Sequence, residues 1–280
     1  MRGVRALVLT GFGINCEEEM AAAYRLAGAE ADIVHLKDVF SGKACLFDYD
    51  ILNFPGGFSF GDDLGAGRVL ANRLKYKQCA TGESFFEQLQ RYIAEGKIII
   101  GICNGFQALV TLGLLPGLAP EIQQEVALVS NDSGKFEDRW CHCVVPKYCT
   151  SPLLPKGALF DFPVRHGEGK LWVPHEETRE LIIRKGLIAL QYCTQEGGIT
   201  EEYPHNPNGA WMSCAALTDP TGQVLGMMPH PEAYLSFYNH PQWPQRLREE
   251  PTAKDEGEGL SLFKHIVEHV RATLHTAVIT

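Results

Sequence analysis

Residues 98–107, IIIGICNGFQ, constrain the fold more than any other stretch of the chain. The β-branched isoleucines at 98, 99, 100 and 102 predict a strand over 98–102 that is buried on both faces of its sheet. The run passes into Gly101-Ile102-Cys103-Asn104-Gly105, and a helical pattern follows. This order of strand, tight glycine turn and helix is that of a nucleophile elbow, with cysteine in the position of serine.

The pattern around this segment predicts an α/β fold. Strands are expected at 4–9, 31–36 and 51–54, and helices at 17–27 and 83–95. Such alternation implies a mostly parallel sheet with helices on both faces and right-handed crossovers. The second half adds strands at 125–130, 140–145, 187–192, 213–217 and 224–228. We expect one domain over residues 1–280, with a loop insertion, long or mobile, at 240–259 and a C-terminal helix at 260–279.

Composition and charge exclude several classes of partner. The chain has 280 residues with 25 Lys and Arg against 34 Asp and Glu, a formal net charge of −9. An acidic balance disfavours binding to a nucleic-acid backbone, and no apolar run approaches the roughly 18 residues of a membrane span. The nine cysteines are odd in number and contain no CxxC pair, which is a poor disulfide framework and a poor zinc motif. We therefore expect a cytoplasmic protein with no metal, no nucleic acid and no membrane partner.

The elbow makes Cys103 the candidate nucleophile. A thiol at a helix N-terminus meets free N–H groups and the positive end of the helix dipole, which favour the thiolate. Gln107 follows one helical turn later, so its side chain leans back toward the thiol. The alternative is that Cys103 is only a small hydrophobic residue in a tight turn.

A base and an oxyanion hole are each suggested by a further segment. In Met228-Pro229-His230-Pro231-Glu232, His230 and Glu232 project to the same side if the backbone is extended, and a carboxylate orients an imidazole. Alone, this segment also fits a loop histidine beside a solvated glutamate.

After the strand at 51–54, Gly56-Gly57 allows close backbone approach, so the N–H groups of Gly57 and Asn104 are the candidate oxyanion donors. A plain turn is the alternative there.

Taken together, these motifs resemble a known family, the class I (triad) glutamine amidotransferases. GxCxGxQ at 101–107, PGG at 55–57 and HPE at 230–232 carry the resemblance. The resemblance is closer still to the glutaminase components of phosphoribosylformylglycinamidine synthase, through the segments GGFSFGDDLGAGR (56–68), SNDSGKFEDRW (130–140), RHGEGK (165–170) and NPNG (206–209). In length and in the wording of its sequence, the chain is more similar to the glutaminase domain that ends the large single-chain synthetases than to compact separate subunits.

The resemblance implies both a fold and a reaction. The fold would be a flavodoxin-like parallel sheet, with Cys103 as nucleophile and His230 and Glu232 as its partners. Phe58, Gln107 and the loop at 165–169, with His166 and Gly167, would help to bind glutamine. Ammonia would pass to a partner synthetase that carries ATP and Mg²⁺ and makes formylglycinamidine ribonucleotide in purine biosynthesis, with or without a third small bridging subunit. The chain itself would need no cofactor.

Two other functions remain open at this stage. One is a cysteine hydrolase that acts alone on an ester or peptide, although the acid two residues after His230 is unusual for such enzymes. The other is a non-catalytic scaffold subunit, although every triad residue type is present.

Overall fold

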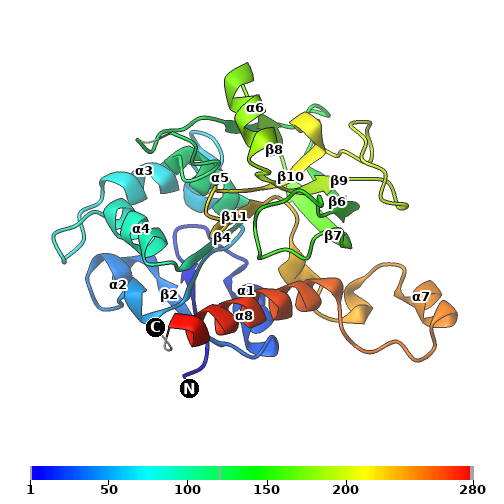
Figure 1. Ribbon diagram of the computed structural model, residues 1–280, viewed down its shortest axis with the longest axis horizontal. Helices are drawn as coiled ribbons and strands as arrows, with labels where there is room; N and C mark the ends of the chain where they lie inside the picture. The colour runs from blue at the N-terminus through cyan, green and yellow to red at the C-terminus, as the bar shows by residue number, and fades with distance from the viewer. Residues whose placement is uncertain (1, 120, 278–280) are drawn as a thin grey trace.

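A nine-stranded sheet runs through the computed structural model, which describes residues 2–119 and 121–277 (Figure 1). Its strand order is β2-β1-β3-β4-β11-β10-β9-β6-β7, and β5 and β8 form a separate pair. The strands are β1 (Arg5–Thr10), β2 (Glu30–His35), β3 (Ile51–Phe54), β4 (Ile98–Ile102), β5 (Ala127–Ser130), β6 (Glu137–Val144), β7 (Leu159–His166), β8 (Glu168–Trp172), β9 (Ile188–Tyr192), β10 (Cys214–Thr218) and β11 (Val224–Met227).

The sheet has a parallel part and an antiparallel part. Strands β2, β1, β3, β4 and β11 pair in parallel, whereas β10, β9, β6 and β7 continue the sheet in antiparallel ladders. The flavodoxin-like α/β fold expected from the sequence is confirmed. Strands β7 and β8 were not expected. Pro163 inside β7 weakens the strand pattern, and it is tolerated there because β7 is an edge strand of the sheet.

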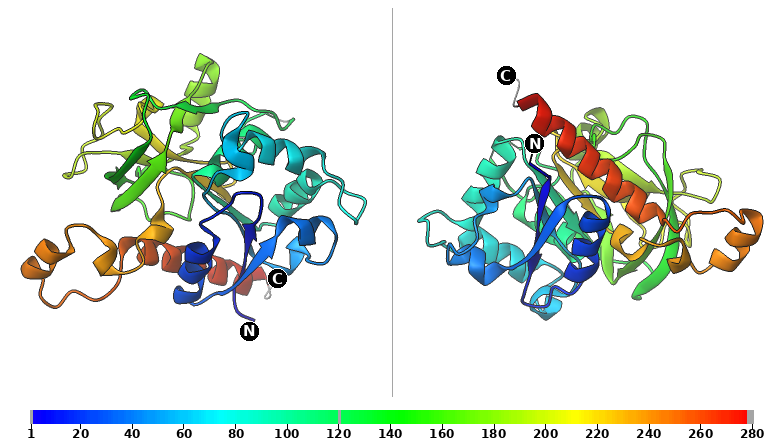
Figure 2. Two further views of the ribbon diagram at one scale, coloured as in Figure 1. Left: turned by 180° about the vertical axis from the view of Figure 1, so that it is seen from behind. Right: turned by 90° about the horizontal axis from the view of Figure 1, so that it is seen from below.

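Helices cover both faces of the parallel part (Figures 1 and 2). α1 and α8 pack together on one face, where Tyr24 and Phe263 meet edge to face with ring centroids 5.0 Å apart. α3, α4 and α5 lie on the other face. The helices are α1 (Glu17–Leu26), α2 (Leu36–Phe40), α3 (Arg68–Tyr76), α4 (Phe85–Ala94), α5 (Asn104–Leu112), α6 (Glu176–Arg184), α7 (Trp243–Glu249) and α8 (Glu258–Ala277). Among the described residues, none of these helices has the length and apolarity needed to cross a bilayer.

Residues 240–259 differ from the expected loop. They contain the short helix α7, and the segment is anchored through the buried carboxylate of Asp161 on β7. His240 Nε2 lies 2.8 Å and Arg246 Nη2 2.6 Å from Asp161 Oδ2. The polar composition gave no sign of this because the partner is 79 residues away in sequence. The C-terminal helix begins at Glu258, two residues before the expected start, and the expected end at residue 279 lies outside the described part of the chain.

The carboxyl ends of the parallel strands meet at one edge of the sheet. The loops that follow β1, β3, β4 and β11 carry Cys16, Gly57, Cys103 and His230, respectively. In open α/β sheets, ligands bind at this edge, where the strand order reverses. The fold thus brings the expected chemical groups together.

Candidate active site

Cys103 lies at a strained turn between β4 and α5. Its backbone angles, φ 50° and ψ −105°, are unfavourable for an L-residue, and its N–H donates to Met227 O at 2.8 Å. Both glycines of the elbow are required by close packing. A Cβ on Gly101 would lie 2.6 Å from a Leu109 methyl, and one on Gly105 would collide with the carbonyl of Phe54. Strain at a position fixed by such packing is typical of functional sites.

His230 and Glu232 form a buried pair. Nδ1 of His230 lies 2.6 Å from Oε1 of Glu232, and each residue is only 3% exposed. The expected pairing is present, but the expected extended backbone is wrong, because Pro231–Ala233 is a 3₁₀ turn that folds Glu232 back beneath the ring. The N–H of His230 donates to Pro163 O at 2.8 Å, which ties the turn to β7.

The electrostatics of His230 favour its protonated form. Burial lowers the pKa of the imidazole, but the adjacent Glu232 carboxylate and the Cys103 thiol raise it by more. The pKa of His230 therefore lies well above its usual value. Nε2 is buried, and no described residue gives it a hydrogen bond of good geometry. An imidazole held at Nδ1 by a carboxylate, with Nε2 free, is the arrangement of a general acid and base.

The N–H groups of the two candidate oxyanion donors are free to bind a substrate oxygen. No described residue accepts a hydrogen bond from the N–H of Gly57 or of Asn104. Gly57 has φ +142°, and a Cβ there would lie 2.6 Å from Gly13 O, so only glycine fits. The Asn104 side chain connects the two donors' segments, because its Oδ1 accepts from the N–H of Ser59 at 3.1 Å.

A cavity of about 150 Å³ opens beside Cys103. It is smaller than the roughly 300–1,000 Å³ of sites for larger ligands, which suits a substrate of amino-acid size. All of the expected glutamine contacts line it, and Asp62, Ala66 and Phe136 were not expected. The full lining is Gly57, Phe58, Asp62, Ala66, Cys103, Gln107, Phe136, Arg165, His166, Gly167 and Glu168.

Gln107 also holds the cavity together. Its Nε2 donates to Glu168 O at 2.6 Å, and its Oε1 accepts from Asn104 Nδ2 at 3.0 Å. The side-chain amide is therefore directed at the 165–169 loop and at Asn104. At the mouth of the cavity, Phe58 and Phe136 are half exposed, with ring centroids 6.3 Å apart.

The loop at 165–169 is held from behind by two buried asparagines that sequence reasoning did not single out. Asn131 Nδ2 donates to His166 O at 2.8 Å, and Asn131 Oδ1 accepts from Gly169 N at 3.1 Å. Asn208 Nδ2 donates to Gly169 O at 2.8 Å. Both lie in segments that carry the family resemblance, SNDSGKFEDRW and NPNG, which was the available signal.

His166 directs its ring at this network. Its Nδ1 lies 3.1 Å from Asn131 Oδ1, and its Nε2 is buried without a described partner. Burial, with a smaller contribution from the charge of His230, lowers the pKa of His166 to about 3. The ring is thus neutral at physiological pH.

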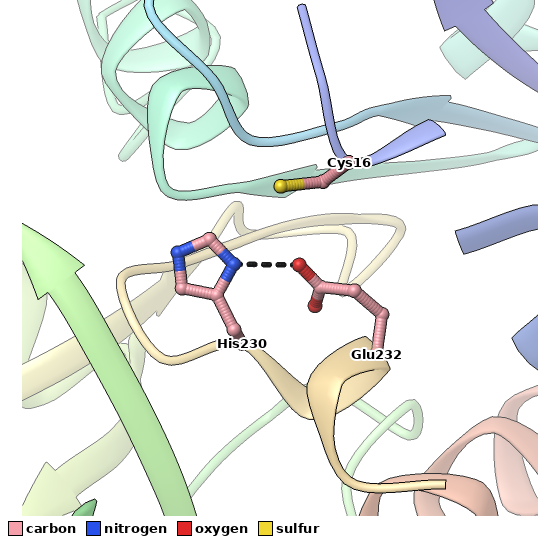
Figure 3. Close-up of side chains that lie close together, drawn as sticks. All are labelled: Cys16, His230 and Glu232. Carbon is pink, nitrogen blue, oxygen red and sulfur yellow. Dashed lines mark hydrogen bonds and ion pairs between the residues drawn. The ribbon is translucent and has the colours of Figure 1, made fainter. Parts of the chain in front are cut away.

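Cys16 was not expected at the site. Among the described residues, one group of side chains could hold a metal ion: Cys16, His230 and Glu232. Figure 3 shows this group in close-up. Cysteine count alone did not distinguish Cys16 from the other eight. The adjacent residues Cys141, His142 and Cys143 do not form such a group among the described residues.

The comparison with protein families agrees with the fold and the site. Residues 3–270 match the family described as the CobB/CobQ-like glutamine amidotransferase domain. The chain thus belongs to the class I glutamine amidotransferases.

Individual similar proteins show which group of glutamine amidotransferases the chain belongs to. The chain is 38% identical to phosphoribosylformylglycinamidine synthase subunit PurQ of Methanococcus maripaludis, over 95% of this chain and 98% of that protein. It is also 38% identical to PurQ of Dehalococcoides mccartyi, over 97% of this chain and 99% of that protein. The solved structure of PurLQS from Thermotoga maritima contains a chain that matches with a TM-score of 0.68 and 26% identity, over 96% of this chain and all of that one. The chain belongs to the family of PurQ subunits.

These comparisons correct one expectation. The phosphoribosylformylglycinamidine synthase of Drosophila melanogaster is 33% identical over 90% of this chain, which spans 18% of that protein. Separate subunits of nearly the same length match at higher identity. The chain is therefore more similar to separate subunits than to the large single-chain form.

Proposed function

We propose that the chain is the glutaminase component of phosphoribosylformylglycinamidine synthase and that Cys103, His230 and Glu232 carry its reaction. One observation carries the proposal: a strained cysteine lies in the wall of a cavity of about 150 Å³ and interacts with a buried His–Glu pair. The family supports glutamine as the amide donor.

The first half of the reaction forms a thioester. The Cys103 thiolate attacks the side-chain carbonyl carbon of glutamine, and the N–H groups of Gly57 and Asn104 stabilise the oxyanion. His230, held by Glu232, gives its Nε2 proton to the departing nitrogen, so that the C–N bond breaks and ammonia leaves. The product on the enzyme is the γ-glutamyl thioester of Cys103.

The second half returns the enzyme to its starting state. His230 Nε2, now without its proton, accepts a proton from water as the water attacks the thioester. The C–S bond breaks, glutamate leaves, and the Cys103 thiolate is restored beside a protonated His230. Phe58, Gln107, His166 and Gly167 bind and position glutamine, and the backbone of the 165–169 loop supplies polar groups at the cavity wall.

The ammonia goes to a partner. We propose that a synthetase subunit uses it to convert formylglycinamide ribonucleotide to formylglycinamidine ribonucleotide, and ATP and Mg²⁺ are expected on that subunit. The match to a chain of PurLQS supports an assembly with other subunits. A third small bridging subunit and a cytoplasmic location are further parts of this proposal, the location resting on the nine free cysteines.

The test is glutamate release from glutamine by the purified chain, alone and with its synthetase, for wild type and Cys103→Ala. We expect release that requires Cys103 and rises with the partner. A diazo-ketone analogue of glutamine should label Cys103, whereas a generic hydrolase would turn over esters or peptides and ignore the analogue. If neither the chain nor the complex releases glutamate, the non-catalytic scaffold function remains instead.

A further inference from the structure

We propose that Cys16, His230 and Glu232 form a binding site for a soft divalent cation of the Zn²⁺ type, and that the bound cation switches off glutamine hydrolysis. The effect on hydrolysis rests on the proposed function, whereas the binding of the cation does not. Cys16 has no role in the reaction described above.

The three side chains offer ligand atoms that Zn²⁺ prefers. A thiol sulfur, an imidazole nitrogen and a carboxylate oxygen all lie within 4.8 Å of one another. Ligands at 2.0–2.3 Å from a tetrahedral ion are roughly 3.5 Å apart, so small side-chain rotations close the site. Figure 3 shows the Cys16 sulfur on one side of the hydrogen-bonded His230–Glu232 pair, facing both members.

The backbone at Gly56 leaves room for this approach. A Cβ on Gly56 would lie 2.8 Å from His230 Cε1, 3.2 Å from Cys16 Sγ and 3.5 Å from His230 Nδ1. The sulfur and the Nδ1 edge of the ring therefore pack against the same point of the chain. Any other residue at position 56 would push Cys16 and His230 away from that point.

An independent observation points to a missing ligand. Oε2 of Glu232 is buried and has no hydrogen-bond partner among the described residues. A buried carboxylate oxygen without a partner is costly, and buried charges are normally paired or coordinate a metal. The reaction explains the free Nε2 of His230, but it assigns nothing to this oxygen. Rotation of the carboxylate, whose Oε1 lies on the Cys16 side in Figure 3, would let both oxygens serve a cation beside Cys16.

Binding at this site would stop the reaction through the protons of His230. The cation replaces the proton on Cys16 Sγ and the proton on His230 Nδ1, and both protons go to solvent. The neutral ring keeps its remaining proton on Nε2, because giving that proton up would leave an imidazolate. The departing nitrogen is therefore not protonated and the thioester does not form, while Glu232 binds the cation instead of orienting the imidazole.

A rival site uses the nucleophile. Zn²⁺ bound between Cys103 and Nε2 of His230 would also inhibit the reaction, without any need for Cys16. The two sites differ in the cysteine they require, so single substitutions separate them.

The experiment measures Zn²⁺ binding to the full chain by competition with a chromophoric chelator. In a Cys103→Ala background, we expect one tight Zn²⁺ per chain, and adding Cys16→Ala should weaken binding by at least about 100-fold. Cys45→Ala in the same background is the matched control, because Cys45 is an exposed free cysteine. Undiminished binding after Cys16→Ala, or loss of binding with Cys103→Ala alone, would overturn the proposal. If Cys16→Ala melts early, Cys16→Ser keeps the volume and weakens the soft ligand.

Inhibition is read separately from binding. Glutamate release at increasing Zn²⁺ is compared with each variant's own metal-free rate, and a chelator should restore it. We expect the midpoint of inhibition to move upward in Cys16→Ala by the same factor as the binding constant. Cys16-dependent binding in a chain that never releases glutamate would refute the proposed function and leave the cation site standing. Glutamate release with no Cys16-dependent binding would do the reverse.

Discussion

The parallel and antiparallel parts of the sheet contribute to the site in different ways. The parallel part supplies Cys103, Gly57 and His230 at strand ends, where glycine packing and backbone hydrogen bonds fix them. The antiparallel part supplies the loop at 165–169, which is held by the side-chain amides of Asn131 and Asn208. The nucleophile and the oxyanion donor Gly57 are thus positioned by the backbone, whereas this wall of the cavity is positioned by side chains that can be replaced. Mutations in the two parts should consequently have different kinetic signatures.

The largest effect should come from the nucleophile. Cys103→Ala removes the thiol that forms the thioester, so we expect glutamine-dependent activity to fall by roughly 10⁴-fold or more. Ammonia-dependent synthesis by the complex should survive, because the partner's reaction does not need Cys103. The measurement is product formation by the complex with glutamine and then with ammonium as nitrogen source. Loss of both activities together would contradict the assignment.

Glu232→Gln should have a smaller effect in the same part of the sheet. The amide keeps the shape of the side chain but loses the negative charge that orients the His230 ring and raises its pKa. We expect kcat to fall about 100-fold with little change in KM, because the glutamate does not line the cavity. The pH profile should also change, with the pKa assigned to His230 moving downward when the carboxylate charge is lost. An unchanged profile would show that Glu232 has no electrostatic role.

Asn208→Ala tests the other part of the comparison. It removes the hydrogen bond to the Gly169 carbonyl and leaves that buried group without a partner, so the substrate loop should shift. We expect KM for glutamine to rise about 10-fold while kcat changes little, the opposite pattern to Glu232→Gln. Steady-state kinetics give both values. The matched control is Asn239→Ala, because Asn239 is exposed and its side chain bonds Ser236 instead of the loop. A fall in kcat alone would break the division between the two parts.

Sequence reasoning succeeded where chemistry depends on local pattern. The strand at 98–102 and the elbow at Cys103 follow from neighbouring residues, because the turn itself demands both glycines. The His230–Glu232 pair was also predicted correctly, but from an extended backbone. In the structure a 3₁₀ turn brings the two side chains together instead.

It failed where the contacts are long-range. Asn131 reaches the loop across 35 residues and Asn208 across 39, and no local periodicity marks either one. Cys16 meets His230 only because the loops after β1 and β11 end at the same edge of the sheet. The anchoring of residues 240–259 by Asp161 is of the same kind.

The smallest expected effect is an absence of titration at His166. Its pKa is lowered to about 3, chiefly by burial, whereas an unfolded histidine titrates near 6.5. Between those values the unfolded chain binds a proton that the folded chain does not, so the contribution of His166 to the free energy of unfolding falls as pH drops below about 6.5. NMR of the histidine rings, with His166→Gln to assign the signal, should show no shift of the His166 ring between pH 8 and 5. A midpoint near 6.5 would mean that water reaches the ring and that the antiparallel wall of the cavity is looser than the parallel one.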